Sequence, residues 1–590
     1  MMFLTLKAFG LLAFATKISA APSNECALAG PGFPSPSGLS NSSLLNEAIT
    51  TFEKSFQNAQ LGLQANDTAW TVALFSSKEN KTLYEHYYTP PIDVGVPEVN
   101  ENSIFRVGSV SKVFSVWSFL IEVGDERFND PITRYIPELA NLSCADGRGD
   151  SQEIYNDIDR VRWEEVTLGQ LASHAAGIPR DPTSNDLAAE LGPDQASAFG
   201  FPALKNTEIP VCNAPGVNRS CTRSELFSYL LKQRPIYPTA HSPAYSNVAY
   251  TLLGYAQQAI TGTPVGAAIT NNIFGTLGMA NSSFTDAPSS GGVIPGGDAS
   301  GAGWDEDLGP FSPAGSIYSS TSDMVKAGQA VLRSALATRA QTRRWLRPLM
   351  QTGYLGTAVG APWEIRYLYL GLGGRRVAQL YTKQGDVGNY HAALVLSPEH
   401  DLGWVVLAAG TAGSRAGGIR ETLMNSIGSV FLPAAERQAR EEAGRNFAGE
   451  FVDAATNSSA TIRTGPSGSP GLLVTSLVSR GVQVIGPQSP LVQIYGVGTS
   501  ARLYPSDLRA TSVSRDGLGT FDSRLGFRAT YFNASQPGEI QDPCLSAWTA
   551  LGAPTYGQVA LDDWVFEMRE DGQAGFLDVR LLRLRMERVK

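Results

Sequence analysis

Residues 105–114 read FRVGSVSKVF, and the serine and lysine in this stretch decide how the rest of the chain is interpreted. Ser109 and Lys112 are three residues apart, a spacing that puts both side chains on one face of a helix and within reach of each other. The apolar stretch that begins at Val113, VFSVWSFLIEVGDE, predicts a buried helix that ends at Gly124. Ser109 therefore lies at the start of an apolar helix.

Two interpretations of this serine and lysine follow from the motif alone. In the first, Ser109 is a nucleophile, because the unpaired N–H groups and the dipole at a helix start favour a developing oxyanion. Lys112, on an apolar helix, would lose hydration, which lowers its pKa and makes it a proton acceptor. In the second, Ser109 caps the helix and Lys112 extends to solvent. The motif is short, and it leaves both interpretations open.

Two further motifs bear on this choice. Tyr245 and Asn247 lie in AYSN, just before an apolar helical pattern, and Lys383 and Gly385 lie in KQG at the end of an expected strand. Each motif is common by itself. Their order along the chain and the elements expected to carry them favour the nucleophile.

In this order, FRVGSVSK, AYSN and KQG resemble the active-site motifs of the serine β-lactamase and penicillin-binding protein superfamily, more narrowly its class C and esterase branch. Other stretches, among them VTLGQLASHAAGIPRD and SPAGSIYSSTSDM, extend the resemblance over about residues 100–430. The layout is similar to that of secreted fungal β-lactamase-like proteins with an extra C-terminal domain. The resemblance implies an α/β (α+β) fold of the β-lactamase/transpeptidase type, in which an antiparallel sheet lies beside an all-helical lobe and the site lies between them.

The resemblance also implies the catalytic roles. Ser109 would attack an acyl carbon and become acylated. Lys112 and Tyr245 would share the proton transfers: one takes the proton of the serine, and the tyrosine protonates the leaving group and later activates water. No metal or cofactor takes part in this chemistry.

The remaining motif residues would bind the substrate. Asn247 would position the substrate or the lysine of the first motif, and Lys383 would direct positive charge towards the tyrosine or a substrate carboxylate. Gly385 completes the strand motif, and the backbone N–H groups of Ser109 and Asp386 would form the oxyanion hole.

Two residues depart from the family pattern. Gln384 stands where the family has a small residue, and Asp386 places an acid after the glycine. A bulky amide and a negative charge beside the pocket would disfavour a β-lactam carboxylate. Antibiotic hydrolysis is therefore not expected.

Composition divides the chain into parts. An apolar stretch from Ala8 to Thr16, followed by small residues, is typical of a secretory signal peptide cleaved after about Ala20 or Ala21. A stretch rich in Pro, Ser and Gly follows, and the last part holds short apolar runs between turns, which predict a β-barrel or sandwich. The predicted parts are a signal peptide over 1–20, an N-terminal arm over 21–55, a serine hydrolase domain over 56–445 and an all-β domain over 446–590.

Secretion agrees with the sequons and the cysteines. The cysteines would meet an oxidising compartment. Cys212 and Cys221 flank the turn-rich stretch NAPGVNRS and are expected to form a disulfide, whereas the pairing of Cys26, Cys144 and Cys544 stays open. The candidate glycosylation sites are Asn41, Asn66, Asn80, Asn141, Asn218, Asn281, Asn457 and Asn533.

The charge pattern limits the partners. The net charge is -9 and the sequence pI is about 5.3, and there is no run of Lys or Arg, which argues against nucleic acid or an anionic membrane as a partner. No segment after the signal peptide is long enough to span a bilayer. The five histidines lack metal-ligand spacing. The expected partner is a small ester, amide or acyl substrate, and the oligomeric state stays open.

The sequence thus predicts a secreted serine hydrolase that cleaves an ester or amide through an acyl-Ser109 intermediate. One alternative is an acyltransferase on the same fold, which would pass the acyl group to a small alcohol, as in secondary metabolism. Another is a binding protein that keeps the fold without catalysis. A penicillin-recognising peptidase ranks lower.

Overall fold

The structure, a computed structural model, contains two compact units. It describes residues 30–589 except 57–61, 141–156, 185, 215–216, 218, 371–375, 467, 490, 492–498, 515–519 and 533–547. One unit is Ser35–Glu441, and the other is Glu442–Lys590 together with the N-terminal residues up to Pro34. The expected signal peptide, residues 1–20, lies outside the described residues. The two units are described separately.

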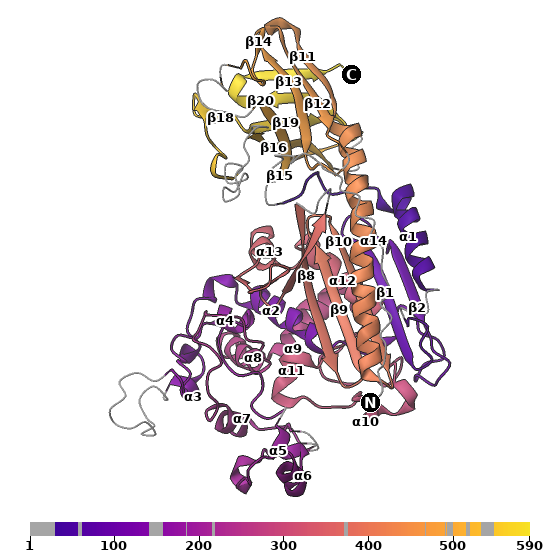
Figure 1. Cartoon of the computed structure of the whole chain (residues 1–590), viewed down its shortest axis with the longest axis vertical. Helices are drawn as coiled ribbons and strands as arrows, with labels where there is room; N and C mark the ends of the chain where they lie inside the picture. Colours follow the sequence, from indigo (N-terminus) through magenta and orange to yellow (C-terminus); the bar gives the residue numbers. More distant parts are fainter. Residues whose placement is uncertain are drawn as a thin grey trace, which may run out of the picture. The chain divides into compact units, whose positions relative to one another are not determined.

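The larger unit is built on an antiparallel sheet, whose described strands number eight in the order β2-β1-β10-β9-β8-β7-β6-β5 (Figure 1). Residues 68–88 form two of them as a hairpin, and residues 376–410 form the three central strands that follow one another in sequence. The strands are β1 Thr68–Ser76, β2 Tyr84–Tyr88, β5 Met350–Gln351, β6 Thr357–Val359, β7 Glu364–Leu370, β8 Arg376–Val387, β9 Tyr390–Ser397 and β10 Leu402–Gly410.

Both faces of this sheet are covered, and alternate residues of β1 belong to different cores. Ala73 and Phe75 pack with Met324 of α12 (Thr321–Arg333) and with the helical lobe. Val72 and Leu74 point to the other face, where α1 (Ser43–Phe56) and α14 (Gly413–Phe447) pack. Successive side chains of a strand point to opposite faces, so a strand covered on both sides is buried throughout, as β1 and β10 are.

Helix α1 differs from the arm expected over residues 21–55. Leu45, Ala48 and Phe52 repeat at the spacing of one helical face and are buried against the sheet. Phe52 also makes an edge contact with Phe431 of α14, with ring centroids 5.3 Å apart. The Pro- and Gly-rich stretch before this helix led to the prediction of an arm over the whole segment, so the helix was not predicted.

The other face of the sheet carries the helical lobe. Helix α2 begins at Ser111 and ends at Glu122, in agreement with the predicted apolar helix, and ten of its twelve residues are buried. The short strand β3 (Ile104–Arg106) comes just before α2 in the sequence and pairs with β4 (Tyr318–Ser320). The other described helices of the lobe are α3 Pro137–Ala140, α4 Leu168–Ala172, α5 Leu187–Glu190, α6 Pro193–Ala198, α7 Arg223–Leu230, α8 Val248–Thr261, α9 Val265–Ala268, α10 Ala299–Ala302, α11 Ser312–Gly315 and α13 Arg339–Trp345.

The smaller unit is a closed antiparallel barrel. Its described strands follow the order β12-β11-β21-β20-β19-β16-β15-β13, and a pairing between β12 and β13 closes the ring of eight, while β14 pairs with β13 alone. The prediction of an all-β barrel or sandwich is confirmed as a barrel. The strands are β11 Gly449–Asp453, β12 Ser458–Thr464, β13 Leu472–Ser479, β14 Val482–Gln483, β15 Ser500–Val513, β16 Thr520–Phe532, β19 Asp563–Met568, β20 Ala574–Val579 and β21 Leu584–Arg588, with a separate pair β17 Thr555–Tyr556 and β18 Val559–Ala560.

Across the described residues, no helix combines the length and apolar character that crossing a membrane requires.

Candidate active site

Ser109 lies in a tight 3-10 turn, Gly108–Val110, that leads directly into α2. The side chain of Ser111 fixes this turn: its hydroxyl donates to the Gly108 carbonyl at 2.7 Å and accepts from the Ile317 N–H at 3.1 Å. Gly108 has a φ of +50°, a left-handed conformation that favours glycine. Ser109 itself is only half-buried, so a substrate can reach it.

Lys112 points inward to Ser109. Its ammonium donates to Ser109 Oγ at 3.0 Å, to Asn247 Oδ1 at 2.7 Å and to the Ala314 carbonyl at 2.8 Å. The side chain is fully buried, and burial lowers its pKa to about 8 against the opposing effect of Tyr245. The interpretation in which this lysine extends to solvent is therefore wrong, and α2 begins without a side-chain cap.

Tyr245 lies between the two lysines of the motifs. The centre of its ring is 5.0 Å from Lys112 Nζ and 5.1 Å from Lys383 Nζ. Burial raises the pKa of the phenol, but the two ammonium charges outweigh burial and lower the pKa to about 8. The ring of His174 stacks on the tyrosine with centroids 4.3 Å apart, and its Nδ1 accepts the Ser246 N–H at 3.1 Å. The site therefore holds a phenol whose pKa lies below its ordinary value of 10.0.

Asn247 connects the lysine to a buried carboxylate that the sequence analysis missed. While its Oδ1 accepts from Lys112, its Nδ2 donates to Asp181 Oδ2 at 3.0 Å. Burial raises the pKa of Asp181, and Asn247, Arg180 and Lys112 oppose that increase. The stretch GIPRD resembles the family, but no spacing rule links its aspartate to a residue 66 positions later.

Strand β8 passes close against the Ser109 turn. A Cβ added to Gly385 would overlap the Val107 carbonyl and lie 2.7 Å from the Ser109 nitrogen. On the other side, a Cβ added to Gly108 would lie 2.6 Å from the Asp386 nitrogen. The two glycines thus allow β8 and the turn to approach until the Ser109 and Asp386 backbones are neighbours.

Lys383 is buried and paired with an acid from the neighbouring strand. Its ammonium lies 2.5 Å from Glu364 Oε1 and donates to the Gln384 carbonyl at 2.7 Å. Burial lowers the pKa of Lys383, but the charges of Glu364 and Tyr245 raise it by more, so the net shift is upward. Glu364 has no motif around it, so its place in the site could not be predicted from the sequence.

Gln384 and Asp386 do not line this site with their side chains. Gln384 Nε2 donates to Glu421 Oε2 of α14 at 2.5 Å, and the Asp386 carboxylate lies 2.5 Å from His391 Nδ1 and 3.4 Å from Arg420 of α14. Alternate residues of a strand point to opposite faces, so both side chains lie on the α14 face, opposite Lys383 and Gly385. The expectation that they would repel a substrate carboxylate is wrong.

The other expected sites are distributed over the chain. Cys212 and Cys221 form a disulfide, whereas Cys26, Cys144 and Cys544 lie outside the described residues. Asn281 is half-buried, and its Nδ2 donates to Asn102 Oδ1 at 3.1 Å. The sequon asparagines Asn41, Asn66, Asn80 and Asn457 are exposed, and Asn141, Asn218 and Asn533 lie outside the described residues.

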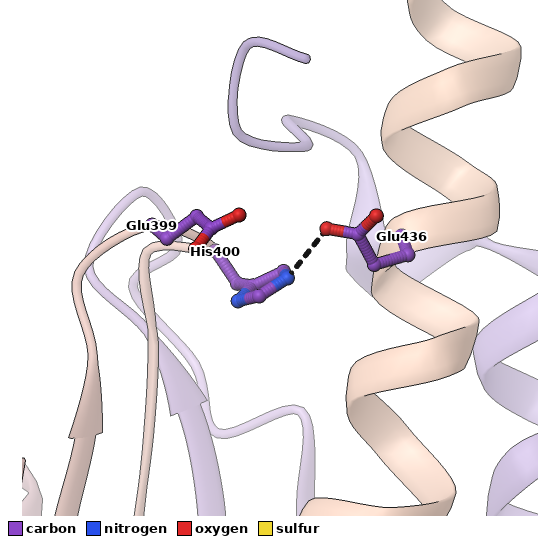
Figure 2. Close-up of side chains that lie close together, drawn as sticks. All are labelled: Glu399, His400 and Glu436. Carbon is purple, nitrogen blue, oxygen red and sulfur yellow. Dashed lines mark hydrogen bonds and ion pairs between the residues drawn. The ribbon is translucent and has the colours of Figure 1, made fainter. Parts of the chain in front are cut away.

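A second cluster of titratable groups lies at the start of β8. Its member on this strand is Arg376, seven residues before Lys383. In Figure 2, His400 of the β9–β10 turn points at Glu436 of α14, with Nε2 and Oε1 2.7 Å apart. The potential ligand atoms of Glu399, His400 and Glu436 lie within 4.8 Å of one another. Arg376 donates to both carboxylates, at 2.6 Å to Glu436, and so supplies positive charge there. The cluster is an ion-pair network that joins β8 to α14.

Comparisons with known proteins agree with this layout. The chain matches a family model described as Beta-lactamase over residues 64–428 and one described as Beta-lactamase-like-like, C-terminal domain, over residues 439–590. It is similar to "Beta-lactamase-like protein" of Arthroderma benhamiae, with 26% identity over 97% of each chain. It is also similar to "Probable hydrolase M10" of a Phoma species, with 24% identity over 96% of this chain and 91% of the relative. A solved beta-lactamase/D-alanine carboxypeptidase from Yersinia pestis, complexed with citrate, matches 64% of this chain and 99% of its own length, with 18% identity and a TM-score of 0.44.

The first family model covers more than half of the chain and includes the Ser109 turn, Tyr245, Asn247 and Lys383. The protein therefore belongs to the beta-lactamase family, and its C-terminal barrel matches the second, separate family model.

Proposed function

We propose that the protein is a secreted serine hydrolase that cleaves an ester or amide through an acyl-Ser109 intermediate. The observation that carries the proposal is the position of the Lys112 ammonium, 3.0 Å from Ser109 Oγ and beside a tyrosine whose pKa is lowered to about 8. A hydroxyl becomes a competent nucleophile when a group able to take its proton lies next to it. Relatives named as hydrolases support the same class of reaction.

In the acylation step, Ser109 Oγ bonds to the acyl carbon and its proton passes to the Lys112–Tyr245 pair. The carbonyl oxygen of the substrate gains negative charge, and the N–H groups of Ser109 and Asp386 are the proposed donors to it. Collapse of the tetrahedral intermediate breaks the bond to the leaving group, which takes the proton from Tyr245. Water then attacks the acyl carbon and gives a proton to the same pair. The bond between that carbon and Ser109 Oγ breaks, and the pair returns the proton to Oγ, which restores the free serine.

A fluorophosphonate probe tests the nucleophile. We expect intact-mass and peptide analysis to place one label on Ser109, and we expect the label to disappear in Ser109→Ala. Ser228→Ala, at an exposed serine of α7, is the matched control and should be labelled like the wild type. Labelling that persists in Ser109→Ala would contradict the assignment.

Product analysis then tests the acceptor. With an ester substrate in buffer we expect the free acid, and added small alcohols should not divert more than a minor share of the acyl group. If the alcohol captures most of the product, the protein is an acyltransferase on the same fold. If neither probe nor ester reacts, the protein binds without catalysis.

A further inference from the structure

We propose that Glu364 sets the charge preference of the active site: by neutralising Lys383, it directs the enzyme to substrates that carry no carboxylate beside the scissile bond. The inference rests on the proposed function, since it concerns the substrate of acyl-Ser109 chemistry. It replaces the explanation based on Gln384 and Asp386, whose side chains lie on the other face of the sheet.

Lys383 already interacts with other groups of the protein. Its side chain is 1% exposed, and its ammonium lies 2.5 Å from Glu364 Oε1 and donates to the Gln384 carbonyl at 2.7 Å. The centre of the Tyr245 ring lies 5.1 Å from the same ammonium. A substrate carboxylate placed against this ammonium would have to share it with Glu364. Two like charges at one cation disfavour each other, which opposes binding of the anion.

The start of β7 explains why Glu364 occupies this position. Strand β7 begins at Glu364, opposite Thr382, whereas β8 continues to Val387. The Gln384 N–H therefore meets no strand residue on this side, and Glu364 Oε2 accepts it at 3.1 Å. The carboxylate is held by a backbone donor as well as by Lys383. About a third of the side chain is exposed, so an incoming ligand meets this acid at the edge of the site.

The other cations near Tyr245 are occupied as well. Lys112 directs its N–H groups at Ser109, Asn247 and the Ala314 carbonyl. Arg180 is mostly exposed, lies 5.0 Å from the centre of the Tyr245 ring and pairs with Asp181, its Nε 3.4 Å from Oδ2. Each cation of the site thus has a partner in the protein, and an uncharged ester or amide is the substrate class that requires none of these pairs to break.

A matched pair of esters tests the inference. The phenylacetyl esters of 3-hydroxybenzamide and 3-hydroxybenzoic acid differ at one group, neutral in the first and anionic in the second. We expect the wild type to favour the neutral ester at least 10-fold in kcat/KM. In Glu364→Gln the preference should fall about 10-fold, mainly through a lower KM for the anionic ester. Glu421→Gln, which changes the acid on the α14 face that binds Gln384, should keep the wild-type ratio.

The outcomes separate this inference from the proposed function. Probe labelling of Ser109 and turnover of the neutral ester establish the function independently of Glu364. With both in place, a wild type that prefers the anionic ester, or a Glu364→Gln ratio within twofold of the wild type, overturns the inference. If thermal melting shows that Glu364→Gln does not fold, Glu364→Asp takes its place: its side chain is one methylene shorter, so we expect a partial fall in the ratio, and an unchanged ratio overturns the inference.

Discussion

In the proposed chemistry, Lys112 and Tyr245 share the proton that Ser109 gives up. Both have a pKa lowered to about 8, Lys112 mainly by burial and Tyr245 by the charges of Lys112 and Lys383, which outweigh its burial. Such a pair titrates as a unit, so the loss of its first proton belongs to both residues. The state with one proton fewer is the one that can accept the proton of Ser109.

The pH profile follows from this pair. We expect kcat/KM for a neutral ester to rise as the pH increases through about 8. The charge of Lys383 lowers the pKa of both partners, so in Lys383→Met the rising limb should move to higher pH. Initial rates between pH 6 and 10 measure it. A limb that stays in place or moves to lower pH would show that Lys383 does not act on this pair.

Short motifs predict the candidate residues that lie within them, but they do not predict the residues that reach the same site from distant parts of the chain. Ser109, Lys112 and Asn247 were predicted, because each motif carries its chemistry within a few residues. Asp181 and Glu364 reach the site from a loop and from the start of a strand, and their contacts depend on pairings that no local pattern shows. Their roles could be recognised only once these segments were placed side by side.

At the level of elements, the contact between β8 and the Ser109 turn makes the position of Gly385 critical. We expect Gly385→Ala to reduce kcat/KM by about 100-fold, because the new methyl group displaces β8 from the Ser109 and Asp386 nitrogens. Steady-state kinetics on a neutral ester measure the loss.

The control for this substitution is Gly353→Ala, where an added Cβ meets nothing within 4 Å. It should keep wild-type kinetics. If Gly385→Ala is folded and as active as the wild type, the close approach of β8 is not needed for catalysis.

The junction of β8 with α14 gives a prediction about stability. Arg376→Met would leave Glu399 and Glu436 without their shared guanidinium, and we expect a loss of about 3–5 kcal/mol of unfolding free energy. Arg437→Met, which breaks a 3.7 Å pair between exposed side chains, should cost less than about 1 kcal/mol. Urea unfolding at pH 7 measures both.

The pH dependence of this loss has a definite sign. Burial raises the pKa of Glu436, but His400 and Arg376 outweigh burial and lower it below its usual value. The stabilisation is therefore complete above the usual carboxyl pKa and disappears as the pH falls through the lowered one. We expect the gap between Arg376→Met and the wild type to shrink in that acid range, and a gap that widens there would contradict this account.

Strand patterns predicted β8 but not the orientation of its residues. The KQG motif placed Lys383 and Gly385 at the end of a strand, which the structure confirms. Period-two alternation does assign Gln384 and Asp386 to the opposite face, but the identity of that face depends on α14 packing behind the sheet. The expectation that the side chains of Gln384 and Asp386 lie beside the pocket is therefore wrong, because both lie on the α14 face of the sheet.

On the scale of the whole molecule, the fold class could be predicted and the N-terminal helix could not. Motif order and family resemblance indicated an antiparallel sheet with a helical lobe, and turn-bounded apolar runs indicated the all-β domain. Residues 43–55 fall within the N-terminal arm predicted over 21–55, because Pro, Ser and Gly dominate the stretch before them. Three apolar residues on one face are a weak signal until a sheet is present to bury them.

Secretion gives the prediction that belongs to the whole chain. In a eukaryotic host that secretes proteins, we expect the culture medium to contain a chain that begins near residue 21 or 22. Glycans should occupy the exposed sequons at Asn41, Asn66, Asn80 and Asn457. N-terminal peptide mapping with and without deglycosylation measures both. A product that keeps residues 1–20 and stays in the cell would contradict secretion.

One of the contacts that hold Lys112 is encoded by no side chain. The ammonium donates to Asn247 and to the main-chain carbonyl of Ala314, and every amino acid supplies that carbonyl. In a saturation library, position 247 should therefore tolerate few residues, whereas position 314 should be limited by the size of its side chain alone. Part of the proposed active site thus depends on the path of the backbone, and a change of side-chain chemistry at position 314 leaves this carbonyl in place.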